Sequence, residues 1–81
     1  MIECEDIKKM ISGAFSCEEV AVEGDGRHFE AVVVSSAFEG KSRVARQQML
    51  NAVLKPHFDS GELHALSMKT LTPSELKALR G

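Results

Sequence analysis

Five side chains of this 81-residue protein carry an imidazole or a thiol that can ligate a transition metal. They are His28, His57, His64, Cys4 and Cys17. Neutral imidazole is the commonest nitrogen ligand in proteins and suits zinc, copper and iron, whereas thiolate sulfur suits zinc and iron-sulfur clusters. A single surface histidine is ordinarily only a polar residue. The chemistry open to this protein therefore depends on which of these groups the fold brings together.

A second chemical possibility lies in a basic segment, residues 41–58, which contains no carboxylate. Its cations are Lys41, Arg43, Arg46 and Lys55. Cations in the first turns of a helix can bind phosphate, because the free amide groups there also attract anions. The alternative is a solvated helix face that balances an acidic first half, since residues 1–39 hold nine acids and three bases. Both interpretations remain open from the sequence.

The hydrophobic pattern and the turn residues predict four helices and three strands. Helices are expected over residues 3–15, from a Ser42 cap to Pro56 along Val44, Gln48, Val53 and Leu54, over 56–60, and over 73–80 after a capped start at Thr-Pro-Ser-Glu 72–75. Strands are expected over 20–22, 29–34 and 64–70. A glycine turn at 24–26 joins the first two strands into an antiparallel hairpin. Pro56 should end the second long helix, because proline has no amide donor and clashes with the preceding turn.

The predicted order α-β-β-α-α-β-α indicates an α+β fold, of the type II KH-like kind, with a three-stranded mixed sheet backed by helices. The helical crossover between the second and third strands makes them parallel, so both strands start at the same end of the sheet. His28 and His64 open these strands, and two imidazoles at one edge would form half of a tetrahedral metal site. Cys17 should lie at the opposite end, and the pattern gives His57 no partner.

Length and composition limit the function further. The length allows one small domain, which we expect over residues 1–81. We expect it in the cytoplasm and without disulfides, because the start is acidic and no apolar run could span a bilayer. No serine or cysteine has a nucleophile motif around it, so we do not expect an enzyme. The segment Gly40-Lys41-Ser42 is not a phosphate loop, because that motif requires glycine where Ser35 stands. Tyrosine, tryptophan and a Gly-x-x-Gly loop are absent, which disfavours RNA but leaves DNA possible.

Two long segments resemble the signature segments of the BolA family. They are Val-Val-Ser-Ser-Ala-Phe-Glu-Gly-Lys-Ser-Arg at 33–43 and His-Ala-Leu-Ser-Met-Lys-Thr-Leu-Thr-Pro at 64–73, with Arg-Gln at 46–47 between them. The resemblance covers nearly the whole chain, and the element order of that family agrees with the predicted one. One departure is Leu76, where family members commonly have tryptophan.

The resemblance implies an adaptor that pairs with a monothiol glutaredoxin in iron-sulfur trafficking or iron homeostasis. In that family a bridging 2Fe-2S cluster is shared with the glutaredoxin cysteine and glutathione. The histidine before Ala-Leu-Ser-x-Lys is one ligand, here His64, and the turn between the first two strands supplies another, here His28. The isolated protein is then expected to hold no cluster, and Cys4, Cys17 and His57 to be bystanders. A homodimer sharing the histidines, and a DNA-binding regulator using Lys41, Arg43 and Arg46, remain alternatives.

Overall fold

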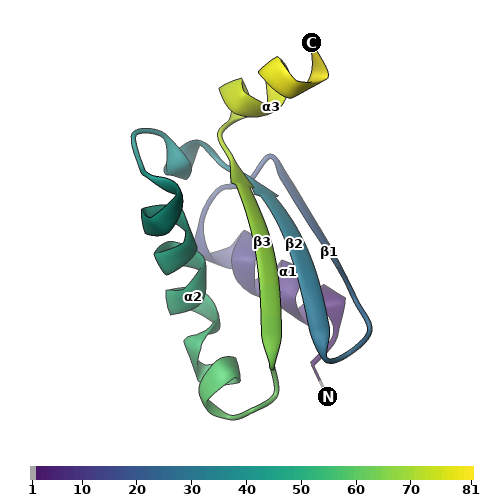
Figure 1. The fold of residues 1–81 in the computed structure, drawn as a ribbon. Coiled ribbons are helices and arrows are strands. Elements are labelled where there is room, and N and C mark those ends of the chain that lie inside the picture. Colours follow the sequence, from purple (N-terminus) through teal and green to yellow (C-terminus); the bar gives the residue numbers. More distant parts are fainter. Residues whose placement is uncertain (1) are drawn as a thin grey trace.

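The computed structural model describes residues 2–81 and shows a three-stranded sheet packed against helices (Figure 1). The elements are α1 (Cys4–Ala14), β1 (Glu19–Gly24), β2 (His28–Val34), the 3-10 helix η1 (Ser36–Phe38), α2 (Arg43–Asp59), β3 (Ala65–Leu71) and α3 (Pro73–Arg80). The predicted α+β fold with a mixed sheet is therefore confirmed. No helix among the residues that the structure describes is long and apolar enough to cross a membrane.

The sheet has the order β1-β2-β3 and the predicted strand directions. β1 and β2 run antiparallel, with Glu19 opposite Val34 and Gly24 opposite Phe29. β2 and β3 run parallel and in register, so that His28 lies opposite Ala65. The crossover through α2 makes this parallel pairing possible, because a tight turn cannot join two parallel strands.

One face of the sheet carries the core. Phe29, Ala31 and Val33 alternate along β2 and are at most 2% exposed, as period-two side chains of a half-buried strand should be. They belong to one buried cluster with residues of α1 and α2, which are Ile7, Ile11, Leu50 and Leu54. In Figure 1, α1 lies behind the strands. On the opposite face, the β2 residues from His28 to Val32 that alternate with the core residues are exposed.

The prediction that Pro56 separates two helices is wrong, because α2 continues through it to Asp59. Pro56 gives up only its own amide, while its carbonyl still accepts a hydrogen bond from the Ser60 amide at 3.0 Å. Phe58 packs against the core, and Lys55 pairs with Asp59 at 2.9 Å across the last turn. Packing thus maintains a turn that local propensity alone would end.

The buried side of α2 agrees with the predicted one only in part. Leu54 is buried as predicted, but Val44 is 62% exposed, and the other buried positions are Arg46 and Leu50. The Ser42 cap is confirmed, because its hydroxyl accepts the Ala45 amide at 3.1 Å. The face that α2 buries therefore begins with a charged side chain, which an apolar pattern cannot reveal.

The last helix, α3, extends beyond the end of the sheet (Figure 1) and has no buried residue. It begins with the predicted cap, in which the Thr72 hydroxyl accepts the Glu75 amide and Glu75 accepts the Thr72 amide. Leu76, which stands where members of the resembled family commonly have tryptophan, is half-buried. Two ion pairs connect this helix to other elements: Glu75 pairs with Arg46 of α2 at 2.7 Å, and Arg80 pairs with Glu19 of β1 at 3.0 Å.

Candidate functional site

The structure brings His28 and His64 to one edge of the sheet. His28 is the first residue of β2, and its partner in the parallel register is Ala65, the first residue of β3. His64 directly precedes Ala65, and both histidines are exposed. The predicted shared edge is therefore confirmed, and in Figure 1 it is the lower end of the two strands.

The backbone that carries His28 is held by Asp25. One carboxylate oxygen of Asp25 accepts the amides of Arg27 and His28, each at 2.9 Å, and the Asp25 amide donates to the His28 carbonyl at 3.2 Å. These two amide donors, His28 first, lower the pKa of the Asp25 carboxyl. Gly26 takes a φ of 98°, a left-handed conformation that glycine adopts without steric cost. The turn thus presents His28 at a defined position.

The backbone that carries His64 is held by the buried residue directly before it in the chain. Leu63 is 2% exposed and donates its amide to the carbonyl of His57 at 3.0 Å. β3 begins one residue after His64. His64 is therefore an exposed side chain between a core anchor and a hydrogen-bonded strand, which limits the movement of its backbone.

These two histidines suit a shared metal group better than a closed site. Within residues 2–81 neither imidazole has a hydrogen-bond partner, and no three histidine, cysteine or acidic side chains group closely enough to hold a metal ion. Strand alternation places His28 on the same face as Ala65, whereas His64 lies outside the strand. Two exposed imidazoles can supply part of a coordination shell, and the remaining ligands of such a site would come from another molecule.

Cys17 lies away from this edge, and Cys4 is occupied by core packing. Cys17 precedes β1 at the opposite end, where the Glu18 amide donates to the Val34 carbonyl at 2.8 Å. Its thiol donates to the Phe15 carbonyl at 3.3 Å, and burial raises its pKa, although a hydrogen bond with Ser35 opposes this effect. A raised pKa disfavours the thiolate that binds metal. Cys4 is half-buried on α1 and packs against the core.

His57 has a partner that sequence reasoning missed. Its Nδ1 lies 3.1 Å from a carboxylate oxygen of Glu62, which the turn at Gly61, with a φ of 82°, brings back toward the helix end. The Ser60 hydroxyl also donates to this carboxylate, and Ser60 and then His57 lower the pKa of Glu62. His57 thus pairs with a carboxylate at the end of α2, and its absence from the ligand set stays a prediction.

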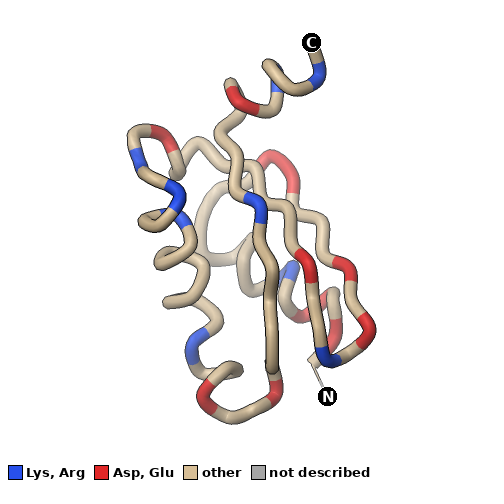
Figure 2. The backbone as a smooth tube through the Cα atoms, viewed as in Figure 1, with Lys and Arg blue, Asp and Glu red and all other residues tan. Residues whose placement is uncertain are grey.

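The basic segment divides into exposed and buried cations. Figure 2 shows several Lys and Arg residues at the start of α2 and one Lys on β3, whereas the charged residues of β1 and the middle of β2 are acidic. Lys41 and Arg43 are exposed, but Arg46 is 7% exposed. The prediction that Arg46 contacts phosphate therefore requires correction, because its guanidinium is engaged within the chain.

Arg46 joins three elements through its hydrogen bonds. It donates to the Lys41 carbonyl at 3.0 Å, to the Thr70 carbonyl at 3.3 Å and to both carboxylate oxygens of Glu75, at 2.7 and 3.3 Å. It also lies 5.9 Å from the ring centroid of the buried Phe38. The pKa of Glu75 is lowered to about 2, and the hydrogen bonds from Arg46 are the largest cause of this shift. The Thr-Pro-Ser-Glu cap identified Glu75 as a helix-start residue, but nothing in the sequence linked it to Arg46.

Comparison with known proteins supports the resemblance that the sequence suggested. The family model described as "BolA-like protein" matches residues 4–75. The acid stress protein IbaG of Escherichia coli K12 is 38% identical over 74 residues, which cover 91% of this chain and 88% of IbaG.

Solved structures agree with the fold. A BolA protein homologue from Coxiella burnetii has a TM-score of 0.82 and 40% identity, covering 95% of this chain and 99% of the homologue. A bol-like protein from Babesia bovis has a TM-score of 0.87 and 28% identity, covering 100% of this chain and 96% of the other. From the family match, the IbaG relationship and the shared fold together, the chain belongs to the BolA-like family.

Proposed function

We propose that this protein is a non-enzymatic adaptor that pairs with a monothiol glutaredoxin and glutathione to hold a bridging 2Fe-2S cluster, in iron-sulfur trafficking or iron homeostasis. The observation that carries the proposal is the exposure of His28 and His64 at one sheet edge, where neither has a partner among the described residues. Family membership supports the same role.

The chemistry of the donor set explains why a partner is required. Iron-sulfur clusters are held mainly by thiolates, and histidine replaces cysteine only at some positions. Cys17 lies at the opposite end of the sheet and Cys4 packs against the core, so His28 and His64 would supply nitrogen and the partner would supply sulfur. The cluster is then cargo shared by two proteins.

The test is reconstitution from purified components. The protein is mixed anaerobically with a monothiol glutaredoxin, glutathione, ferrous iron and sulfide, and the products are examined by native mass spectrometry and visible absorption. We expect a heterodimer with one 2Fe-2S cluster and one glutathione, and no cluster on this protein alone. A glutaredoxin that keeps its cluster in a homodimer, with this protein left free, would contradict the proposal.

DNA binding remains a second candidate through Lys41 and Arg43, which are exposed at the start of α2. Without Arg46, about two phosphate contacts remain, and these would give a log-log salt slope near −1.8 on duplex DNA. A titration at several salt concentrations measures the slope. Affinity that is unchanged in the double variant Lys41→Gln, Arg43→Gln would remove this candidate.

A further inference from the structure

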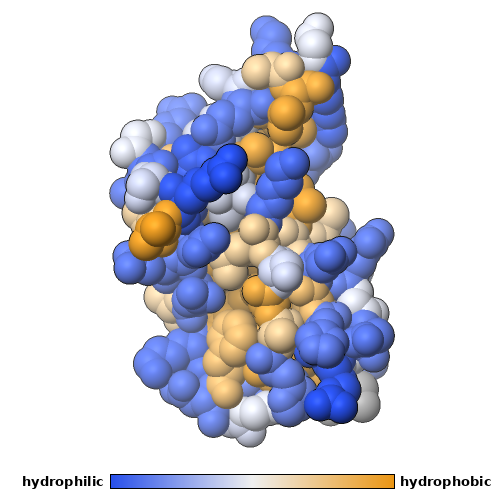
Figure 3. Space-filling view, viewed as in Figure 1, coloured by the Kyte–Doolittle hydropathy of each residue, from blue (hydrophilic) through white to orange (hydrophobic). Residues whose placement is uncertain are grey.

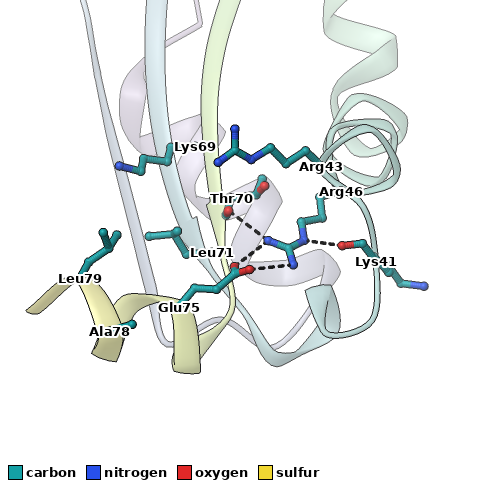
Figure 4. A pocket seen from close by; sticks show the side chains of 9 residues that line it. All are labelled: Lys41, Arg43, Arg46, Lys69, Thr70, Leu71, Glu75, Ala78 and Leu79. Atoms are coloured by element: carbon teal, nitrogen blue, oxygen red, sulfur yellow. Dashed lines mark hydrogen bonds and ion pairs between the residues drawn. The ribbon is translucent and has the colours of Figure 1, made fainter. Parts of the chain in front are cut away.

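One cleft of the structure contains neither of the two histidines of the proposed cluster site. It lies between α3, the end of β3 and the start of α2, and its volume is about 560 Å³ (Figure 4). The cleft is lined by Lys41, Arg43, Arg46, Lys69, Thr70, Leu71, Glu75, Ala78 and Leu79. Small-molecule sites commonly have volumes of about 300–1,000 Å³. The cleft therefore has the size of a ligand site.

The charge of this cleft is strongly positive although the whole chain carries −2. Four basic side chains line it against a single carboxylate, Glu75. Arg46 already binds both oxygens of that carboxylate, so each of these two groups largely neutralises the other. The remaining cations are exposed and belong to no ion pair of the described residues; they are Lys41, Arg43 and Lys69. A negatively charged group would be attracted here.

One wall of the same cleft is apolar. Leu79 is 64% exposed on α3, and Leu71 at the end of β3 is half-buried. In Figure 4 these leucines lie on the same side of the cleft as Lys69, whereas Arg43 reaches toward β3 from α2 and Lys41 points away. Figure 3 shows apolar atoms of α3 beside strongly hydrophilic side chains at this end of the molecule. Aliphatic contact and positive charge are thus available within one cleft.

The cleft also continues along the outer side of β3. A second hollow of about 420 Å³ shares Arg43, Lys69, Thr70 and Leu71 with the first and extends to Gln47 and Met68. β3 is an edge strand, so no further strand occupies this side. A ligand longer than a single ionic group therefore has space to extend.

We infer that this cleft binds a small amphipathic anion, a phosphate or carboxylate joined to a short aliphatic chain. The anionic group would contact Arg43 and Lys69, and the aliphatic chain would lie against Leu71 and Leu79. A free phosphate would leave the apolar wall exposed to water, and a neutral alcohol would leave the cations without a counter-ion. Both parts of the ligand are needed because the two kinds of contact add to its affinity.

The test uses the whole protein and octyl phosphate below its micelle concentration, followed by ¹H–¹⁵N NMR. We expect saturable one-to-one binding with shifts at the amides of residues 69–71 and 78–79, and an affinity at least tenfold above that for inorganic phosphate or octanol. Equal affinity for octyl phosphate and inorganic phosphate would overturn the inference. So would shifts spread evenly over the surface.

Matched variants locate the site. Arg43→Gln and Lys69→Gln should each lower the affinity about three- to tenfold, and Leu79→Ser should bring octyl phosphate close to inorganic phosphate. Lys77→Gln is the control, because Lys77 is also exposed on α3 but does not line the cleft. Spectra of the free variants verify folding, which exposed substitutions should preserve. Unchanged affinity in all three cleft variants would refute the site.

A final arm distinguishes a free ligand from a lipid headgroup. Vesicles that contain an anionic phospholipid are added in place of octyl phosphate, and binding is followed by sedimentation. We expect the protein to remain in the supernatant, because the cleft accepts a single short chain rather than a flat bilayer surface. Sedimentation with vesicles without binding of octyl phosphate would replace this inference by a membrane contact.

Discussion

The two ends of β3 use their polar side chains in opposite ways. At the start, His64 and the neighbouring His28 are exposed, and their imidazoles have no partner within residues 2–81. At the other end, Arg46 is buried and its guanidinium donates to the Thr70 and Lys41 carbonyls and to Glu75. The backbone is hydrogen-bonded at both ends of β3, but only the side chains at the start of the strand are left without hydrogen-bond partners among the described residues.

This difference separates a role in binding from a role in folding. A side chain whose hydrogen bonds are satisfied inside the chain must break them to bind anything else, and leaving its partners unsatisfied is costly. An exposed imidazole on a fixed backbone can accept a metal without such a loss. Substitutions at the histidine edge should therefore change partner chemistry, and substitutions at Arg46 should change stability.

The largest effect is expected from His64→Ala. Loss of this ligand should alter the visible spectrum of the cluster-bridged complex and shorten the cluster lifetime more than tenfold, because ligand geometry dominates cluster retention. The free energy of unfolding should change by less than about 0.5 kcal/mol, since the side chain is exposed. His57→Ala is the control, and an equal loss of the cluster in that variant would mean that the ligand set is wrong.

Arg46→Ala should produce the reverse result. Removing the guanidinium leaves the Thr70 carbonyl without this donor and separates α2 from α3, so the free energy of unfolding should fall by about 2 kcal/mol. Chemical denaturation measures the change. The exposed neighbour Arg43→Ala should change stability by less than about 0.5 kcal/mol. Equal free energies of unfolding for the two variants would contradict a structural role for the buried Arg46.

The Glu75 carboxylate should make stability depend on pH. Its pKa is about 2 in the folded protein against an ordinary value of 4.5, so between these values the unfolded chain binds the proton and the folded one does not. The stabilisation is therefore complete above about pH 5 and is lost as the pH falls toward 2. Because Glu75 is partly exposed, solvent screens the effect.

The variant Glu75→Gln isolates this contribution. It should be less stable than the parent at pH 7 and should lose less stability between pH 5 and 2, as followed by thermal unfolding across that range. Asp25 and Glu62, whose pKa values are also lowered, should leave a residual slope. Glu39→Gln, at an exposed carboxylate outside every ion pair of residues 2–81, should keep the parental slope.

The smallest effect is expected from Asp25→Ala, which tests how the histidine edge is positioned. The variant loses the two hydrogen bonds that fix the Arg27 and His28 amides, while both imidazoles remain. The cluster lifetime in the complex should shorten a few-fold, less than in His28→Ala. A lifetime equal to that of the parent would show that the turn need not be fixed.

The sequence by itself determined the elements that depend on neighbouring residues. Apolar, β-branched runs on either side of a glycine turn specified the β1–β2 hairpin, and Ser42 and Thr72 marked the starts of α2 and α3. The helical crossover between β2 and β3 then favoured a parallel pairing, which places His28 and His64 at one edge. These features follow from short-range geometry and a general topological rule.

Only the tertiary structure decided the fate of groups whose partners are distant in the chain. Arg46 resembled the exposed Lys41 and Arg43 in sequence, yet it is buried because Thr70 and Glu75, 24 and 29 residues away, satisfy it. Pro56 predicted a helix end, but core contacts of Phe58 kept α2 intact. A local pattern records the propensity of a residue, whereas burial and ion pairing depend on which elements the fold packs together.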